Sequence, residues 1–193
     1  LDAVVGGTPL PGWPVRVRGT GAPCQPGAFT AGEQRKAFAE GVSVFPKQLA
    51  AGLDVHRETR VTALEPRGAS VRILLEDGHT VDAPRAVLAL PTEPARALLT
   101  PFAPLDAEID AAVRLLDMVG THPSLTVIAG YEQAPPDWDI WYPEDSRVLQ
   151  VLSHDSAKRP SPARLVLVLQ AHPAWSRARF DADPEVWTGP LLG

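Results

Sequence analysis

The Asp77-Gly78 dipeptide is the feature that most restricts how this chain folds. Both residues tolerate positive φ, and the pair is a strong signal for the two-residue turn of a β-hairpin. The turn separates the alternating stretches Val71–Glu76 and His79–Asp82, and the β-branched stretch Thr59–Glu65 precedes them with the same period. Because a period of two places alternate side chains on one face of a sheet, these residues predict an antiparallel meander.

The segment after the meander has the pattern of a buried strand followed by helices. Arg85–Leu90 is a continuous apolar run that ends at Pro91, as in a strand covered on both faces in a parallel sheet. Thr92 can cap a helix over Glu93–Leu99, and Leu105–Leu116 has the spacing of an amphipathic helix. We expect a domain boundary near residue 100, between the two helices.

Strand patterns dominate the second half of the chain. Turns rich in Pro, Asp and Gly separate short apolar stretches, which favours an antiparallel sheet. These stretches are Ser124–Tyr131, Asp139–Tyr142, Arg147–Ser153 and Arg164–Ala171. Helices are expected at Ala31–Glu40, from about Pro46 onward, and over Pro173–Phe180 and Pro184–Leu192. The order of elements predicts a mixed α and β protein of the α+β class.

The composition argues against several classes of partner. A net charge of −5 over 193 residues disfavours nucleic acid, because neutralising phosphates needs a basic surface. No apolar run approaches the roughly 18 to 20 residues that span a bilayer, so no membrane partner is expected. Cys24 is the single cysteine, which excludes an internal disulfide and a cysteine-based metal site and favours a cytoplasmic location.

Motifs for hydrolysis and metal binding do not stand out. Ser153-His154-Asp155-Ser156 holds all three residue types of a catalytic triad, but neighbours on a strand point to opposite faces and cannot form the required line. We expect Asp155 and Lys158 to fix a turn instead. The five histidines are scattered, without an H-x-x-x-H or H-x-H pair, so no metal site is predicted. The catalytic residues stay unassigned.

Several stretches, taken in order, resemble the flavin-containing amine oxidases, and the renalase-like flavoproteins in particular. Val44–Val55 followed by Thr59–Glu65 is similar to a helix and strand in the middle of these proteins, and Ala86–Pro91 is similar to the buried strand that comes next. Their substrate domain, an antiparallel sheet flanked by helices, is resembled by Trp138–Trp141, Leu152–Pro160 and Gln170–Ser176. The resemblance extends over residues 40–190.

This resemblance implies three regions and an FAD cofactor. Residues 1–43 would form an irregular N-terminal segment with a helix, 44–100 a partial FAD-domain-like region with the meander and buried strand, and 101–193 the substrate-domain-like sheet with helices. In relatives, the residue that matches Val61 meets adenine through its backbone, and the strand end that matches Leu90-Pro91 lies near the pyrophosphate or flavin. The alternative is that Val61 is a plain core valine and that Leu90 and Pro91 merely end a strand.

Trp138, Trp141 and Tyr142 are the candidates for a substrate pocket. A flavin amine oxidase needs an apolar, water-excluding pocket beside the flavin, and aromatic residues of the substrate sheet suit its walls. If this stretch is extended, alternation places Trp138 and Tyr142 on one face and Trp141 on the other. The alternative for each residue is packing in the core.

Two parts of the family pattern are not found in the chain. Its 193 residues contain no G-x-G-x-x-G turn for the pyrophosphate and no closing Gly-Asp turn for the flavin. We therefore expect a fragment that does not retain FAD alone. The predicted function is part of an FAD-dependent oxidoreductase that oxidises an amine-like or dihydropyridine-like small molecule. The alternative is a non-catalytic ligand- or protein-binding domain derived from that family, and we also expect a homodimer.

Overall fold

The computed structural model describes residues 12–20, 38 and 41–193, and its chain divides into two compact units. Unit 1 comprises residues 1–53 and 122–193, and unit 2 comprises residues 54–121. Unit 1 is thus discontinuous in sequence, with unit 2 inserted between its two stretches. The predicted helix at Ala31–Glu40 falls, apart from Phe38, outside the described residues.

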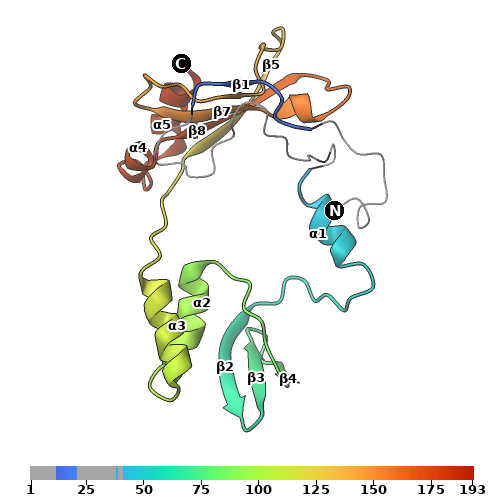
Figure 1. The fold of residues 1–193 in the computed structure, drawn as a ribbon, viewed down its shortest axis with the longest axis vertical. Coiled ribbons are helices and arrows are strands. Elements are labelled where there is room, and N and C mark those ends of the chain that lie inside the picture. The colour runs from blue at the N-terminus through green and yellow to red at the C-terminus, as the bar shows by residue number, and fades with distance from the viewer. Residues whose placement is uncertain (1–11, 21–37, 39–40) are drawn as a thin grey trace. The chain divides into compact units, whose positions relative to one another are not determined.

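Unit 1 is built on a five-stranded sheet (Figure 1). The strands, in spatial order, are β1 (Val17–Arg18), β6 (Ile140–Trp141), β7 (Leu149–His154), β8 (Leu165–Ala171) and β5 (Thr126–Tyr131). All neighbours are antiparallel except β1 and β6, which are parallel. The antiparallel sheet predicted for the second half of the chain is therefore present, with one parallel strand added from the N-terminal stretch.

The register of the sheet explains its core. Trp141 lies opposite Leu152, Leu152 opposite Leu169, and Leu169 opposite Val127, so four neighbouring strands place apolar side chains on one face. These residues form one cluster together with Trp138. A second cluster, formed by Ile140, Tyr142 and Val151, receives Trp13 and Val17 from the N-terminal stretch.

Short helices complete unit 1: α1 (Val44–Leu49), the 3-10 turn η2 (Asp155–Lys158), α4 (Pro173–Arg177) and α5 (Pro184–Leu192). Helix α5 packs against β5 and β8, and its Leu191 is fully buried. Ser176 of α4 is also buried, and its Oγ accepts a hydrogen bond from the Leu125 N–H at 3.0 Å. The helices near Pro46, Pro173 and Pro184 agree with the sequence expectation.

Unit 2 contains the predicted meander and two helices. The strands β2 (Val61–Arg67), β3 (Ser70–Leu75) and β4 (Thr80–Ala83) form a three-stranded antiparallel sheet. Gly78 closes the second hairpin with a φ of 85°, which glycine adopts without steric cost. The helices are α2 (Thr92–Leu99) and α3 (Ala107–Asp117), joined through the 3-10 turn η1 (Thr100–Phe102).

The cap residues of the two helices differ from each other. Asp106 caps α3, because its Oδ1 accepts hydrogen bonds from the N–H groups of Glu108 and Ile109. Helix α2 already begins at Thr92, so Pro91 takes the cap position, without a side-chain hydrogen bond. The helix over Glu93–Leu99 is thus confirmed, whereas Thr92 does not act as its cap.

The expectation of a buried strand over Arg85–Leu90 is wrong. These residues form no strand, and the side chain of Val87 is 92% exposed. An apolar run is buried as a strand only when other strands lie beside it, and within residues 54–121 the sheet ends at β4. The apolar pattern indicated that the run could form a strand, whereas its burial depends on strands from elsewhere in the chain lying beside it.

The units also differ from the expected boundary. Helices α2 and α3 pack against each other within unit 2, so residue 100 lies inside a compact unit. The family-based division at residues 43 and 100 stays a prediction. The mixture of helices with two sheets confirms the α+β class. In the described part of the chain, no helix combines the length and apolar character needed to cross a membrane.

Candidate functional site

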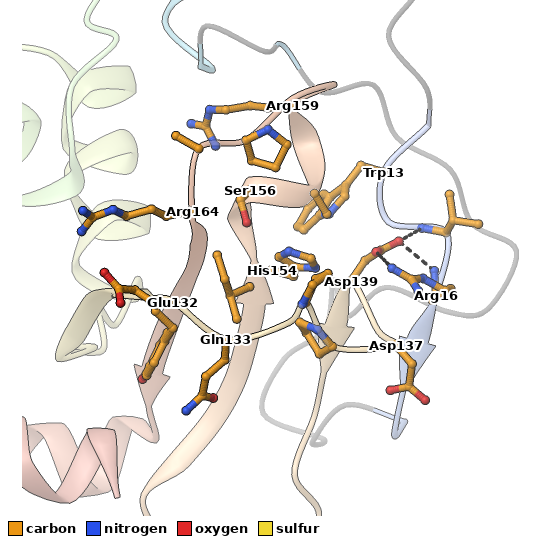
Figure 2. A pocket seen from close by; sticks show the side chains of 18 of the residues that line it. Trp13, Arg16, Glu132, Gln133, Asp137, Asp139, His154, Ser156, Arg159 and Arg164 are labelled. Atoms are coloured by element: carbon orange, nitrogen blue, oxygen red, sulfur yellow. Dashed lines mark hydrogen bonds and ion pairs between the residues drawn. The ribbon is translucent and has the colours of Figure 1, made fainter.

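A hollow of about 1070 Å³ lies within unit 1 (Figure 2). Three stretches line it: residues 12–16 before β1, residues 131–139 from the end of β5 to the start of β6, and residues 154–165 from the end of β7 to the start of β8. Its walls combine apolar side chains, such as Trp13, Pro136 and Leu165, with ionisable ones. This size is typical of a small-molecule site, and the mixed lining suits a ligand with an apolar body and a few polar groups.

Asp139 fixes one wall of the hollow. Its side chain is only 6% exposed, and Oδ2 accepts hydrogen bonds from the N–H groups of Val15 and Arg16 at 2.8 and 3.0 Å. Oδ1 is 3.0 Å from Nη2 of Arg16 (Figure 2). In return, the Arg16 carbonyl accepts from the Asp139 N–H at 2.8 Å. A buried carboxylate is tolerated when its oxygens are satisfied in this way, so Asp139 anchors the N-terminal stretch to β6.

The environment of Asp139 favours its charged form. Burial by itself raises the pKa of this carboxyl, but the hydrogen bonds from Val15 and Arg16 and the Arg16 charge outweigh that effect. The pKa of Asp139 therefore lies below its ordinary value, and the group is a carboxylate at neutral pH. It acts as an acceptor and anchor, because a carboxylate of lowered pKa is a weak base.

His154, at the end of β7, is a buried histidine in the lining of the hollow. It is 4% exposed, and its backbone N–H donates to the Asp139 carbonyl at 2.8 Å. The imidazole hydrogen-bonds to the backbone of Trp138, while Nδ1 has no partner among the described residues. Burial lowers the pKa of His154 more than Trp138 and Asp139 raise it, so the ring is neutral at neutral pH.

The turn after β7 confirms one expectation from the sequence. Lys158 Nζ lies 2.9 Å from Asp155 Oδ1, and Arg159 Nη1 lies 2.6 Å from Asp155 Oδ2. These bonds hold the 3-10 turn, and Lys158 Nζ also lies 4.2 Å from the centre of the Trp13 ring. Ser156 Oγ accepts from the Val166 N–H at 3.0 Å. Asp155 and Ser156 each have a structural partner, in agreement with the rejection of a triad.

None of the three aromatic candidates is among the described lining residues of the large hollow. Trp138 is a buried member of the first core cluster, and its ring centre is 5.9 Å from that of Trp141. Tyr142 belongs to the second cluster. The expectation that Trp138 and Tyr142 share a face is wrong, because only Ile140 and Trp141 are in strand conformation and the chain before them does not alternate. Trp141 and Tyr142 line a smaller hollow of about 410 Å³, and their role with a substrate stays a prediction.

The cofactor candidates lie in unit 2. Val61 is the first residue of β2, half-buried, beside an irregularity in the pairing with β3. Leu90 is 45% exposed, and Pro91 precedes α2. Nothing in the arrangement of the described residues tests their contact with a cofactor, so those roles also stay predictions.

Sequence reasoning missed Asp139, His154 and Arg16 as a group. Arg16 and Asp139 are separated by 123 residues, and no short motif links residues at such a distance. The one available signal was Asp139 itself, an acidic residue within an otherwise apolar aromatic stretch. Charged residues are rarely buried unless they are paired, so its position pointed to a partner without naming it.

Comparisons with known proteins identify the class. A family model described as flavin-containing amine oxidoreductase matches residues 22–176, which is more than half of the chain. The chain therefore belongs to the flavin-containing amine oxidoreductase family. This confirms the resemblance to the flavin-containing amine oxidases, whereas the likeness to renalase stays a prediction. Among curated protein sequences, no match was found.

Solved structures agree on the fold. A provisionally assigned protoporphyrinogen oxidase from Exiguobacterium sp. 255-15 is 18% identical, with a TM-score of 0.61 over 83% of this chain and 36% of its own. A triple mutant of putrescine oxidase, redesigned in its cofactor binding, is 20% identical, with a TM-score of 0.63 over 82% of this chain and 35% of its own. The chain thus spans little more than a third of the length of each solved relative.

The residues of unit 2 do not fit an FAD pyrophosphate by themselves. A phosphate cradle needs glycines that let backbone N–H groups approach the ligand at a helix N-terminus. In residues 54–121 the glycines are Gly68, Gly78 and Gly120, none of which precedes α2 or α3 directly. An added Cβ at any of them would meet no atom within 4 Å, so they face open space rather than a built cradle. In the described part of the chain there is also no cluster of three or more groups that could hold a metal ion.

Proposed function

We propose that this chain supplies the substrate-binding portion, and part of the flavin domain, of an FAD-dependent oxidoreductase. Its substrate would be an amine-like or dihydropyridine-like small molecule, as in a renalase-like enzyme. The observation that carries the proposal is the large hollow in unit 1, most of whose lining lies within the residues that match the family. A family member needs a place for an organic substrate, and this hollow has the size for one.

The chemistry of the lining supports a small organic substrate. Trp13, Pro136 and Leu165 offer apolar contact, and His154 is uncharged at neutral pH. The apolar side chains can hold the body of an organic substrate, and the polar groups between them can orient it. What this chain would contribute is binding and orientation of the substrate.

We further propose that these 193 residues do not retain FAD alone and are a fragment of a longer enzyme. Support comes from the lack of a G-x-G-x-x-G turn in the sequence and from the open surroundings of the unit 2 glycines. A cytoplasmic location and a homodimer complete the proposal. The single cysteine supports the location, and the exposed apolar side chains of unit 2 support association.

The retention of FAD is tested with purified protein of the printed sequence. We expect a colourless protein whose melting temperature does not rise when FAD is added in excess. A yellow protein, or a rise in melting temperature that depends on FAD concentration, would contradict the fragment proposal. Sedimentation of the same sample tests the homodimer.

The oxidoreductase function is tested on the complete encoding reading frame. We expect a G-x-G-x-x-G turn upstream and a Gly-Asp turn downstream, and a purified product that binds FAD. Anaerobic mixing with a panel of amines and dihydropyridines should bleach the flavin absorbance for one class. A complete frame without either turn, or a flavin that no member of the panel reduces, would contradict the function.

The alternative is a non-catalytic ligand-binding domain derived from the family. One observation favours it: the described lining of the large hollow belongs entirely to unit 1, so the hollow needs no flavin to exist. The reading-frame experiment separates the two, because the alternative predicts ligand binding without any flavin reduction.

A further inference from the structure

The unpartnered nitrogen of His154 points to a binding role. The hydrogen bond between the His154 ring and the Trp138 backbone raises the pKa of the ring. A ring N–H that donates to a carbonyl has this effect, so the ring is the donor and the Trp138 carbonyl the acceptor. Since Nδ1 has no partner among the described residues, Nε2 is the donating nitrogen. In a neutral ring whose proton is on Nε2, Nδ1 carries a lone pair and is an acceptor. His154 therefore presents a buried acceptor without a donor.

Such an acceptor is costly unless something satisfies it. Buried polar atoms in native proteins are almost always hydrogen-bonded, and an orphan next to a cavity suggests a bound molecule. His154 lies in the lining of the large hollow, and Figure 2 shows its ring among the other lining side chains, beside Asp139. Asp139 cannot satisfy Nδ1, because a carboxylate only accepts hydrogen bonds.

The charges of the lining indicate what kind of molecule fits. Arg16 pairs with Asp139, and Arg159 shares Asp155 with Lys158, so each of the two lining arginines already has a carboxylate partner. The remaining charged residues of the lining, Glu132, Asp137 and Arg164, carry both signs and are exposed. No single charge dominates, which favours a ligand that is recognised by shape and a hydrogen bond rather than by an ion pair.

We propose that the hollow of unit 1 binds a small molecule with an apolar body and one O–H or N–H group, and that this group donates a hydrogen bond to His154 Nδ1. Trp13, Pro136 and Leu165 contact the apolar body. Because Nδ1 is enclosed, binding involves a small rotation of the imidazole toward the hollow. The inference rests on the proposed function only in using the same hollow. Because the described lining belongs to unit 1, ligand binding can be tested without any flavin.

Three matched probes test the donor requirement. They are 2-(hydroxymethyl)naphthalene, 2-(aminomethyl)naphthalene and 2-(methoxymethyl)naphthalene, which share the aromatic body and differ in the donor; the amine also carries a positive charge at neutral pH, so the alcohol and the ether are the matched neutral pair. The full chain is labelled with ¹⁵N-histidine, and the Nδ1 resonance of His154 is followed during titration. We expect the alcohol or the amine to shift this resonance and to bind about tenfold more tightly than the ether. Comparison of the alcohol with the amine shows whether the hollow prefers a hydroxyl or an amino group.

Substitution of His154 tests the acceptor. His154→Gln places an amide N–H near the position of Nε2, which preserves donation to the Trp138 carbonyl and leaves no acceptor at the position of Nδ1. We expect this variant to bind the donor probe about tenfold more weakly, while its affinity for the ether is unchanged. His154→Phe removes both functions and serves as a second variant if the first is poorly folded. His172→Gln is the matched control. The Nε2 of His172 lies 3.1 Å from the Ser146 carbonyl oxygen, and His172 is not among the lining residues of the hollow.

Several outcomes would overturn the proposal. One is equal binding of ether and donor probes, and another is unchanged binding after His154→Gln. A resonance that shows a proton on Nδ1 in the free protein would also do so, since that nitrogen would then be a donor. Failure of both donor probes to perturb any lining residue would refute the site itself.

Discussion

The two units bury their apolar residues to very different degrees. Unit 1 joins strands from both of its stretches into two core clusters. In unit 2, all of which the structure describes, the buried apolar side chains are Ala95, Leu98 and Val113. Exposed apolar side chains are correspondingly frequent there: Val55, Val81, Val87, Leu90, Leu105, Leu115, Met118 and Val119. Good local signals thus form strands and helices without producing a closed core.

The difference teaches that secondary structure and burial have separate causes. Unit 2 has the clearer turn signal, at Asp77-Gly78, and a well-capped helix at Asp106. Unit 1 has weaker local signals but contacts between residues more than a hundred positions apart. The hydrophobic contribution follows the area removed from water, so unit 1 should be the more stable unit.

The largest expected effect comes from removing the anchor of unit 1. Asp139→Ala leaves the N–H groups of Val15 and Arg16 and the Arg16 guanidinium without their acceptor, and we expect a loss of about 3 kcal/mol. Urea unfolding measures the loss, and hydrogen exchange should place it in unit 1. Asp82→Ala is the control, because Asp82 forms an exposed ion pair with Arg72 in unit 2. Equal losses in both variants would refute the special weight given to Asp139.

The next effect should come from the small core of unit 2. Leu98→Ala removes one of its three buried apolar side chains, and we expect a loss of about 2 to 3 kcal/mol. Hydrogen exchange should show unit 2 opening while unit 1 stays protected. Leu169→Ala is the matched change in the core of unit 1. If Leu98→Ala left exchange in unit 2 unchanged, the contrast between the two cores would be wrong.

A smaller effect is expected from pH. Because the pKa of His154 is lowered in the folded state, the unfolded chain takes up a proton first as the pH falls. The contribution of neutral His154 to the free energy of unfolding is fully present above about pH 6.5, the ordinary pKa of histidine. It is lost as the pH falls toward the lowered pKa of the folded state. Urea midpoints between pH 7.5 and 5 should decline, and His154→Gln should reduce the decline. An identical decline in the variant would show that other groups cause it.

The carboxylate of Asp139 acts at lower pH. Its lowered pKa means that its contribution is present above about pH 4 and is lost as the pH falls through the folded value. The decline that His154 causes is therefore separated from that of Asp139 along the pH axis.

The smallest effect is expected in the apolar run of unit 2. Val87→Lys changes a side chain that is 92% exposed, so we expect a stability change within about 0.5 kcal/mol. Urea unfolding checks this, with Val113→Lys at a buried position of α3 as the contrasting variant. A large loss at Val87 would mean that the run is buried after all.

Most of the elements could be predicted from the sequence because their causes are local. Asp77-Gly78 fixes a hairpin through the positive φ that glycine accepts, and the prolines at 173 and 184 begin helices. The resemblance to the family was found in the same way, from ordered short motifs. These features depend on residues within a few positions of each other.

The rest depends on contacts that no local pattern encodes. The site was missed because Asp139 meets Arg16 across 123 residues and His154 meets Asp139 through the sheet. The prediction that Trp138 shares a face with Tyr142 was wrong because the chain bends before β6. The prediction that Arg85–Leu90 is buried was wrong because a run of apolar residues does not specify the strands beside it.

The parallel pairing of β1 with β6 has a consequence for synthesis of the protein. Arg16 leaves the ribosome 123 residues before Asp139, and at ordinary elongation rates this delay is roughly 6 to 25 s. Residues 54–121 emerge during the delay and can fold first, whereas Trp13 and Val17 have no core to enter. The nascent chain therefore exposes Trp13 and Val17 for many seconds, a period in which chaperones can bind them.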